Sequence, residues 1–189
     1  MPSLASISDP NAYHIIAYGT LLGSNIFQSF FAGPIGYSCL PRPQFATLQT
    51  KITPPYFALQ TALPVILAVT WPGIKIVDSA GKQLGRRESG WRGLLLDRHL
   101  WTALTPIAVM FGTSVLNLFV LGPATTQVMK KRKHQETKDG KKSYEPGPKS
   151  TEMERLNTTF AWLHGGSALS NLVGLGAMLF YGVVLAEKV

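Results

Sequence analysis

LNTTFAWLHGGSALSNLVGLGAMLFYGVVLA, residues Leu156–Ala186, contains no Asp, Glu, Lys or Arg. Three other windows share this property: 11–41, 52–74 and 99–129. An α-helix rises about 1.5 Å per residue and the hydrocarbon core of a bilayer is about 30 Å thick, so about 20 apolar residues can cross it. Each window is longer than that. The sequence therefore predicts four membrane spans and an all-α fold, an integral membrane four-helix bundle.

The expected ends of the spans follow from capping and helix-breaking residues. Asp9 can cap a helix, and Pro10 suits the first helical position because its missing N–H is not needed there, so the first helix should begin near residue 10. Gly-Pro pairs indicate the ends of the first and third spans. We expect a single transmembrane domain over 1–189, with spans of about 11–33, 56–75, 100–121 and 156–186.

The three connectors differ in composition. In the first, 35–55, prolines break the helix while apolar residues such as Phe45 keep a helical spacing, which predicts a short interfacial helix after the first span. The second, 75–98, has glycines scattered among mixed charges and is typical of a solvated loop. The third, 130–150, is basic and poor in apolar residues, so we expect a disordered loop.

Composition excludes several functional classes. Only 15% of the residues are charged, whereas soluble domains average about 25%. The lone Cys39 excludes an intrachain disulfide and a thiolate-based zinc site. Nearly all of the basic residues that give the net charge of +8 lie in the connectors. They do not alternate with aromatic residues as in a nucleic-acid interface. Because no phosphate-loop, zinc-protease or serine-hydrolase motif occurs, we expect no enzyme activity, no cofactor, no metal and no nucleic acid.

The distribution of Lys and Arg predicts the orientation. An even number of spans places both termini with the second connector, which gives seven basic residues on that side and eleven on the side of the first and third connectors. The positive-inside rule therefore places connectors one and three in the cytosol. We expect an integral, multi-pass protein of the lipid bilayer. An endomembrane is the favoured location, although no retrieval signal names the organelle.

Two features mark the expected membrane boundaries. A basic cluster directly follows the third span and consists of Lys130, Lys131, Arg132 and Lys133. Such a cluster is most often a topological anchor, and it also resembles a patch that binds anionic lipid. The four tryptophans near the window ends suit the headgroup level: Trp71, Trp91, Trp101 and Trp162.

Polar residues inside the windows form the candidate site. Uncompensated polar groups in hydrocarbon are costly, so such residues usually face the interior of the bundle. Helical spacings of three, four or seven place several of them on shared faces. The candidate polar seam, contributed by the first, third and fourth spans, comprises Asn25, Gln28, Asn117, His164, Ser167 and Asn171. The second span is expected to be a plain anchor.

Two interpretations of these polar residues remain open. They either join the helices by hydrogen bonds or line a path for a solute. Small residues spaced by four also permit close approach of helices and could support a homo-oligomer; they are Gly19 and Gly23, and Gly166, Ser170 and Gly174. His164 together with Met110 and Met178 could bind a soft ion such as copper(I), but the sequence has no second suitably placed histidine and no Met-x-x-Met pair.

Three stretches carry a family resemblance: NIFQSFFAGPIGYSCLPRPQFATLQTKITPPYFALQ (Asn25–Gln60), NLFVLGPATTQVMKKRKHQE (Asn117–Glu136) and FAWLHGGSALSNL (Phe160–Leu172). Together they resemble the transmembrane protein 205-like family. The resemblance covers about 13–184 and implies four transmembrane helices, a domain of unknown function and a remote likeness to copper-resistance membrane proteins. Matching positions outside the seam are Gly33, Pro41, Arg42, Phe45, Gln49, Tyr56, Gly122 and Pro123.

Two functional hypotheses follow. The first is a polytopic membrane protein of unknown biochemical role that handles a small solute or a soft metal ion through the polar seam. The second is a structural or adaptor membrane protein whose basic loops bind a partner or anionic lipid, with the seam holding the helices together.

Overall fold

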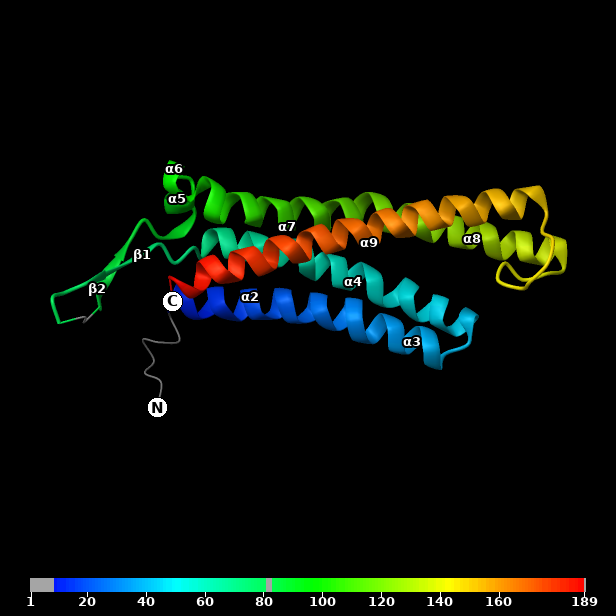
Figure 1. Cartoon of the computed structure of the whole chain (residues 1–189), viewed down its shortest axis with the longest axis horizontal. Coiled ribbons are helices and arrows are strands. Elements are labelled where there is room, and N and C mark those ends of the chain that lie inside the picture. The colour runs from blue at the N-terminus through cyan, green and yellow to red at the C-terminus, as the bar shows by residue number, and fades with distance from the viewer. Residues whose placement is uncertain (1–8, 81–82, 189) are drawn as a thin grey trace.

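The computed structural model describes residues 9–80 and 83–188 and shows a long bundle of helices (Figure 1). Four helical stretches are long and apolar enough to cross a membrane. These stretches are Pro10–Cys39, Arg42–Val69, Asp97–Asp139 and Thr151–Ala186. The predicted all-α, four-helix membrane fold is confirmed.

Two of the four stretches consist of several helical elements. The first stretch contains α2 (Pro10–Ile26), the π-helix η1 (Phe27–Ala32) and α3 (Gly33–Cys39). The third contains α6 (Asp97–His99), η2 (Leu100–Leu104), α7 (Thr105–Leu116), η3 (Asn117–Leu121) and α8 (Gly122–Asp139). The second and fourth are single helices, α4 (Arg42–Val69) and α9 (Thr151–Ala186).

Side chains cap the first and last of these stretches. The Asp9 carboxylate accepts a hydrogen bond from the backbone N–H of Asn11 at 3.0 Å, and α2 begins at Pro10 as the sequence predicts. Ser150 Oγ accepts a hydrogen bond from the backbone N–H of Met153 at 3.2 Å and so caps α9.

Each π-helix is followed, after one residue, by a proline. The residue before each proline donates its N–H to the carbonyl five residues earlier: Gly33 to Gln28, Thr105 to Leu100, and Gly122 to Asn117. In a regular helix a proline ring would collide with the carbonyl four residues earlier. The wider π turn gives the ring room, and the helix continues. The helices therefore do not end at the two Gly-Pro pairs, although the sequence predicts helix breaks there.

α8 contains much of the connector that the sequence predicts to be disordered. Lys, Arg, Gln and Glu are good helix formers, and a polar helix becomes stable once it has a packing partner. α9 is that partner, because Arg132 Nε donates to Asn157 Oδ1 at 2.9 Å. The helix ends at Gly140, whose φ is 64°. The prediction of disorder over 130–150 is therefore wrong for residues 130–139.

The expected interfacial helix is not a separate element. Pro41 is the N-cap residue of α4, which runs unbroken past Pro54 and Pro55. These prolines remove the N–H donors that would bond the carbonyls of Thr50 and Lys51. Both residues are exposed near the connector, where interfacial water can bond those carbonyls. The segment predicted to be a separate interfacial helix therefore forms the first turns of α4.

The second connector forms a β-hairpin instead of the expected loop. β1 (Ile74–Val77) pairs antiparallel with β2 (Gln83–Arg87), the first residue of β1 opposite the last of β2. The short helix α5 (Gly90–Leu94) follows. Gly73 has a φ of 68°, and a Cβ there would overlap the carbonyl of Arg87. Glycine therefore allows a close approach at the base of the hairpin, where the sequence pattern suggested a flexible loop.

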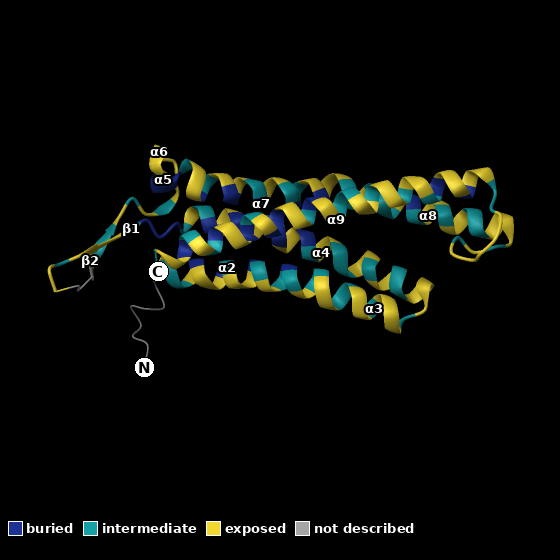
Figure 2. Ribbon diagram, in the orientation of Figure 1, coloured by how far each residue is buried: buried dark blue, intermediate teal, exposed yellow. Residues whose placement is uncertain are grey.

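The apolar core occupies the half of the bundle nearer the hairpin (Figure 2). All four stretches contribute deeply buried side chains, among them Leu21, Leu67, Met110, Met178 and Tyr181. Trp71, just after α4, is 1% exposed and closes the core at the hairpin end. Trp71 is therefore a core residue and not the headgroup residue expected. The other three tryptophans are exposed: Trp91, Trp101 and Trp162.

The hairpin, the start of α2 and the end of α9 lie at one end of the bundle (Figure 1). Arg86 Nη1 donates to the carbonyl oxygens of Pro72 and Lys188, each at 3.2 Å, which joins the hairpin to the end of the chain. The α3–α4 and α8–α9 connections lie at the opposite end, and the α8–α9 pair extends beyond the α3–α4 pair. The first and third connectors therefore share one side of the bundle.

Candidate functional site

In the half of the bundle away from the hairpin, polar side chains of all four stretches form hydrogen bonds between neighbouring helices. Asn25 and Asn171 each lie near the middle of a charge-free window, so this set begins near the bilayer centre and continues toward the first and third connectors. We call it the polar seam. Its members are Ser24, Asn25, Gln28, Ser29, Gln49, Tyr56, Gln60, Asn117, Ser167 and Asn171.

Asn171 is the central residue of the seam. Its Oδ1 accepts hydrogen bonds from Asn25 Nδ2 at 3.1 Å and from Tyr56 Oη at 3.0 Å. Its Nδ2 donates to Ser29 Oγ at 2.9 Å. One amide thus joins the first, second and fourth stretches. Since a buried polar group without a partner costs about 1–3 kcal/mol, these bonds specify how the three helices pack.

Gln60 joins α4 to α2 one turn closer to the apolar core. Its Nε2 donates to the Leu21 carbonyl at 3.1 Å and to Ser24 Oγ at 2.9 Å. The Gln60 side chain is buried. Ser24 in turn donates to the Thr20 carbonyl at 2.6 Å, so its oxygen is free to accept from Gln60.

The third and fourth stretches are joined by Ser167 Oγ, which donates to Asn117 Oδ1 at 2.7 Å. About one turn closer to the core, Ser170 Oγ donates to the Thr113 carbonyl at 3.2 Å. Gly174 allows this close packing, because a Cβ there would lie 2.8 Å from Thr113 Oγ1. The small residues of this part of α9 therefore pack against α7.

Other small residues point to open space. A Cβ added at Gly19, Gly23 or Gly166 would have no neighbouring heavy atom within 4 Å among the described residues. This face of α2 does not pack within the bundle, so the use of Gly19 and Gly23 for self-association stays a prediction.

The outer end of the seam lies beside the α3–α4 turn. Gln28 Nε2 donates to Gln49 Oε1 at 3.5 Å. The Arg42 guanidinium lies 3.5 Å from the centroid of the Tyr37 ring, and the Phe45 ring meets the same ring edge-on at 5.5 Å. Arg42 and Phe45, two positions of the quoted motifs, thus fix the α3–α4 turn, and a third, Gln49, bonds to the seam.

His164 does not belong to the seam. Its side chain is exposed and stacks on Phe160, with 5.7 Å between ring centroids and 5° between ring planes. The spacing of seven places His164 on the same face of α9 as Asn171. His164 is nevertheless exposed. The α3–α4 pair diverges from α9 toward the α3–α4 connection (Figure 1). The structure thus places His164 apart from the hydrogen bonds of the seam. Of the other predicted residues, Asn25 bonds to Asn171, Ser167 bonds to Asn117, and Gln28 bonds to Gln49.

The soft-metal set is not assembled. Met110 and Met178 belong to the apolar core. Met178 lies fourteen residues along α9 from His164, which is about 21 Å at the helical rise. Within 9–80 and 83–188, no three His, Cys, Asp or Glu side chains form a metal-binding group. The seam presents neutral amides and hydroxyls, which are poor ligands for a soft ion.

α4 contributes polar side chains to the seam, although the sequence predicted the second span to be a plain anchor. Gln49, Tyr56 and Gln60 are seven and four residues apart and therefore share one face of the helix. Prolines beside Tyr56 suggested a boundary, which hid this periodicity. The helical spacing rule that relates Asn25 to Gln28 would also have indicated this polar face of α4.

Three seam amides each have a buried atom without a hydrogen-bond partner among the described residues. These atoms are Asn25 Oδ1, Gln60 Oε1 and Asn117 Nδ2. The three side chains are at most 2% exposed. Buried polar atoms in proteins are nearly always paired with protein, water or ligand. Two acceptors and one donor in the seam thus have no protein partner among the described residues.

A second buried polar cluster closes the hairpin end. His14 Nδ1 lies 2.9 Å from Thr70 Oγ1, and His14 Nε2 lies 2.7 Å from Tyr181 Oη. The Thr70 hydroxyl donates to the Ile66 carbonyl at 2.6 Å, so its oxygen accepts from Nδ1–H, and Tyr181 donates to Nε2. Both nitrogens of a neutral imidazole are thus paired. The sequence pattern did not indicate His14, because a single histidine at a helix start has no diagnostic spacing.

Trp71 links this cluster to the hairpin. Its ring lies 6.4 Å from the ring of His14 and 5.3 Å from that of His99. His99 Nε2 lies 3.2 Å from Glu88 Oε2, and Arg98 Nη1 lies 3.3 Å from Glu88 Oε1. These contacts hold the hairpin against the bundle and close the end opposite the polar seam.

Residues 16–134 match the family model described as Domain of unknown function (DUF4149). The match covers more than half of the chain and includes the first three helical stretches as far as α8. The chain belongs to the DUF4149 family. This family's description assigns no chemistry, so the seam's role rests on its geometry.

A curated relative covers almost the whole chain. The protein named Xanthocillin biosynthesis cluster protein D, from Aspergillus fumigatus, is 28% identical over 185 residues, 98% of this chain and 94% of the relative. No solved structure shows a significant match to the chain.

Proposed function

We propose that this chain is a polytopic membrane protein that binds a small uncharged polar solute in the polar seam. The observation that supports this most directly is the set of unpaired atoms Asn25 Oδ1, Gln60 Oε1 and Asn117 Nδ2. These atoms lie in the bilayer interior, where water is not freely available to pair them. A solute with both donor and acceptor groups would pair them.

The chemistry of the seam favours an uncharged ligand. Its side chains are amides, aliphatic hydroxyls and one phenol, as defined above. A charged solute at this depth would need a compensating charge, which the seam does not hold. The seam also holds no carboxylate or imidazole that could exchange a proton with a substrate. The proposed role is therefore binding rather than catalysis, and it excludes the soft metal ion.

The solute would enter from the side of the first and third connectors. The apolar core and the Trp71 cluster close the hairpin end. On the other side, the α3–α4 and α8–α9 pairs diverge, and the exposed His164 lies on the face that continues from Asn171 (Figure 1). A solute bound in the seam would therefore cross the membrane only if the core rearranged.

The comparisons are consistent with handling of a small molecule. The Aspergillus relative is named as a protein of a biosynthesis cluster, and by extension we propose that this chain acts alongside small-molecule biosynthesis. We also propose that it is a transmembrane protein 205-like member of its family, on the three motifs quoted above.

Cysteine accessibility tests the proposal. In a Cys39→Ser background, Ser167→Cys places a thiol in the seam and Ala168→Cys places one on the exposed face of α9. The probe is 2-hydroxyethyl methanethiosulfonate, a small uncharged polar reagent. Thiols react as thiolates, which need a polar environment. In proteoliposomes, we expect the Ser167→Cys thiol to react at least ten times faster than the Ala168→Cys thiol, measured by intact-mass spectrometry.

Because the two thiols are on neighbouring residues, the opposite result can also be interpreted. If the seam is closed and dry, both thiols face apolar surroundings and react at similar slow rates. Equal rates, with both variants monodisperse, would show that the seam only joins helices. Reversal of the order would likewise exclude solute entry.

A further inference from the structure

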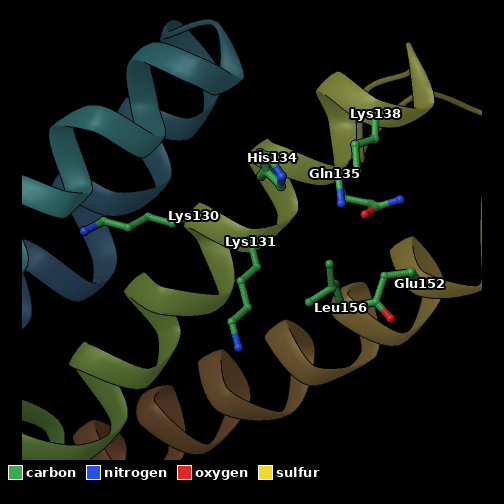
Figure 3. A pocket seen from close by; sticks show the side chains of 7 residues that line it. All are labelled: Lys130, Lys131, His134, Gln135, Lys138, Glu152 and Leu156. Carbon is green, nitrogen blue, oxygen red and sulfur yellow. The ribbon is translucent and has the colours of Figure 1, made fainter.

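A basic hollow lies between α8 and the start of α9, beyond the polar seam (Figure 3). Its volume is about 580 Å³, within the range of about 300–1,000 Å³ that is usual for small-molecule sites. The main lining side chains are Lys130, Lys131, His134 and Lys138 of α8 and Glu152 and Leu156 of α9. Figure 3 shows Lys131 extending from α8 toward α9.

The lysines of the hollow outnumber its lining acid, Glu152, which interacts electrostatically with Lys131 and Lys138. The Glu152 carboxylate is also engaged by Arg155, whose Nε and Nη2 donate to the two carboxylate oxygens at 3.0 and 2.8 Å. In the described part of the chain, no carboxylate oxygen lies within 4 Å of the ammonium groups of Lys130, Lys131 or Lys138. The hollow is therefore a site of net positive charge.

The walls of the hollow are held in place by Arg132, which does not line it. Arg132 Nε donates to Asn157 Oδ1 at 2.9 Å, and its guanidinium lies 4.4 Å from the centroid of the Phe160 ring. The basic cluster of the sequence thus has two roles. Arg132 fixes α8 against α9, whereas Lys130 and Lys131 line the hollow, and of these two only Lys131 extends toward α9 (Figure 3).

The hollow lies at the expected level of the lipid headgroups. Met129 is the last residue of a charge-free window, and Lys130 follows it. The Arg132–Asn157 hydrogen bond sets the level of α9 beside α8. Trp162 is 75% exposed and lies five residues from Asn157 toward the bilayer, about 7.5 Å along the helix. An exposed tryptophan is typical of the membrane boundary, so lipid phosphates lie within reach of the hollow.

We propose that this hollow binds the phosphorylated headgroup of an anionic lipid in the leaflet that faces the first and third connectors. A phosphate monoester carries nearly two negative charges near neutral pH, and lysine ammonium groups bind it through charge-assisted hydrogen bonds. Its position at the bilayer surface and the apolar Leu156 in its lining favour a lipid over a soluble phosphate compound. This site is separate from the seam and does not depend on solute binding there.

Lipid binding is measured with the full chain in detergent micelles, using fluorescent short-chain phosphatidylinositol 4,5-bisphosphate and fluorescence anisotropy. The test variant is Lys130→Gln/Lys131→Gln/Lys138→Gln. Each lysine near an anionic lipid surface contributes about fivefold to binding, so the triple variant should bind about a hundredfold more weakly. Single replacements should each weaken binding about fivefold, which provides a second test if the triple variant is unstable.

The matched control is Lys51→Gln/Lys133→Gln/Lys142→Gln, which removes the same charge from exposed lysines on the same side but outside this hollow. We expect its affinity to stay within threefold of the original chain. Equal losses for the two triple variants would show diffuse attraction and overturn the proposal, as would no loss for either. Soluble inositol 1,4,5-trisphosphate that binds as tightly as the lipid would overturn the lipid assignment.

Discussion

Asn171 and His164 are seven residues apart on one face of α9, yet only Asn171 is enclosed. Asn171 bonds to side chains of α2, η1 and α4, whereas His164 is exposed beside Phe160. Helical spacing predicts a shared face, and it did so correctly here. It does not predict the depth at which neighbouring helices cover that face, because their divergence depends on the whole bundle. Among the predicted seam residues, Asn25 therefore bonds to Asn171 and Ser167 to Asn117, while Gln28 bonds to Gln49 and His164 stacks on Phe160.

Replacement of Asn171 by Leu should destabilise the protein. The change leaves Asn25 Nδ2 and Tyr56 Oη without their acceptor and Ser29 Oγ without its donor. Hydrogen bonds between membrane helices contribute about 0.6–1.7 kcal/mol each, so we expect a loss of about 2 kcal/mol in the free energy of unfolding. Titration with sodium dodecyl sulfate from mild micelles measures it.

His164→Leu is the matched control on the same helix. Its side chain is exposed and contacts Phe160 through ring stacking alone among the described contacts. We expect a change within about 0.5 kcal/mol, as is usual for surface positions. A loss for His164→Leu as large as that for Asn171→Leu would contradict the central role of the Asn171 amide.

The helical elements depend on how the chain accommodates proline. Gly-Pro pairs at 33–34 and 122–123 predict helix ends by local propensity, but π turns carry both helices past them. The sequence signal was real, since the hydrogen-bond pattern does change at each pair. Its outcome depended on packing: α8 lies against α9, which stabilises a helix beyond residue 122. Local propensity therefore located the irregular turns, but it did not predict that the helices continue beyond them.

Gly122→Ala tests the third π segment. An alanine Cβ there would lie 2.7 Å from the carbonyl oxygen of Asn117, a seam residue. Overpacking of this kind costs about 1–3 kcal/mol, and we expect a loss of about that size in the free energy of unfolding. Gly112→Ala is the control, because its Cβ would meet no heavy atom within 4 Å and alanine favours helix. If both variants are equally stable, the close approach at Gly122 does not contribute to the free energy of unfolding.

At the scale of the whole molecule, the four spans and the shared side of connectors one and three follow from the charge-free windows. The β-hairpin does not, because its formation rests on the close backbone approach at Gly73 rather than on a long apolar pattern. The seam's fourth contributor, α4, and the packing of Trp71 between His14 and His99 also depend on contacts distant in sequence. Hydropathy thus determines the membrane architecture, and tertiary contacts determine the site.

The single cysteine provides a test of sidedness. Cys39 is exposed at the end of α3, on the side of the first and third connectors. In sealed microsomes, a membrane-impermeant maleimide should label Cys39 without detergent, because the positive-inside rule places that side in the cytosol. A protease site placed between residues 140 and 149 should be cut from the same side. An epitope joined after the last residue should be protected.

The labelling pattern separates two possible errors. Labelling of Cys39 only after detergent, with the epitope accessible, would invert the predicted orientation. Access to Cys39 and the epitope from the same side would contradict four spans. A Cys39→Ser chain is the control for labelling of other nucleophiles.

The π turns also bear on how chains of this family can vary in length. The hydrogen bond of a π turn joins residues five apart, so it encloses one residue more than the hydrogen bond of an α turn. Deleting one residue from 27–32 or 117–121, together with replacing the proline that follows, would convert the bulge to a regular turn and leave later side chains on their present faces. A deletion elsewhere in these helices would rotate every later side chain by about 100°. Single-residue gaps between homologues should therefore concentrate at these two segments.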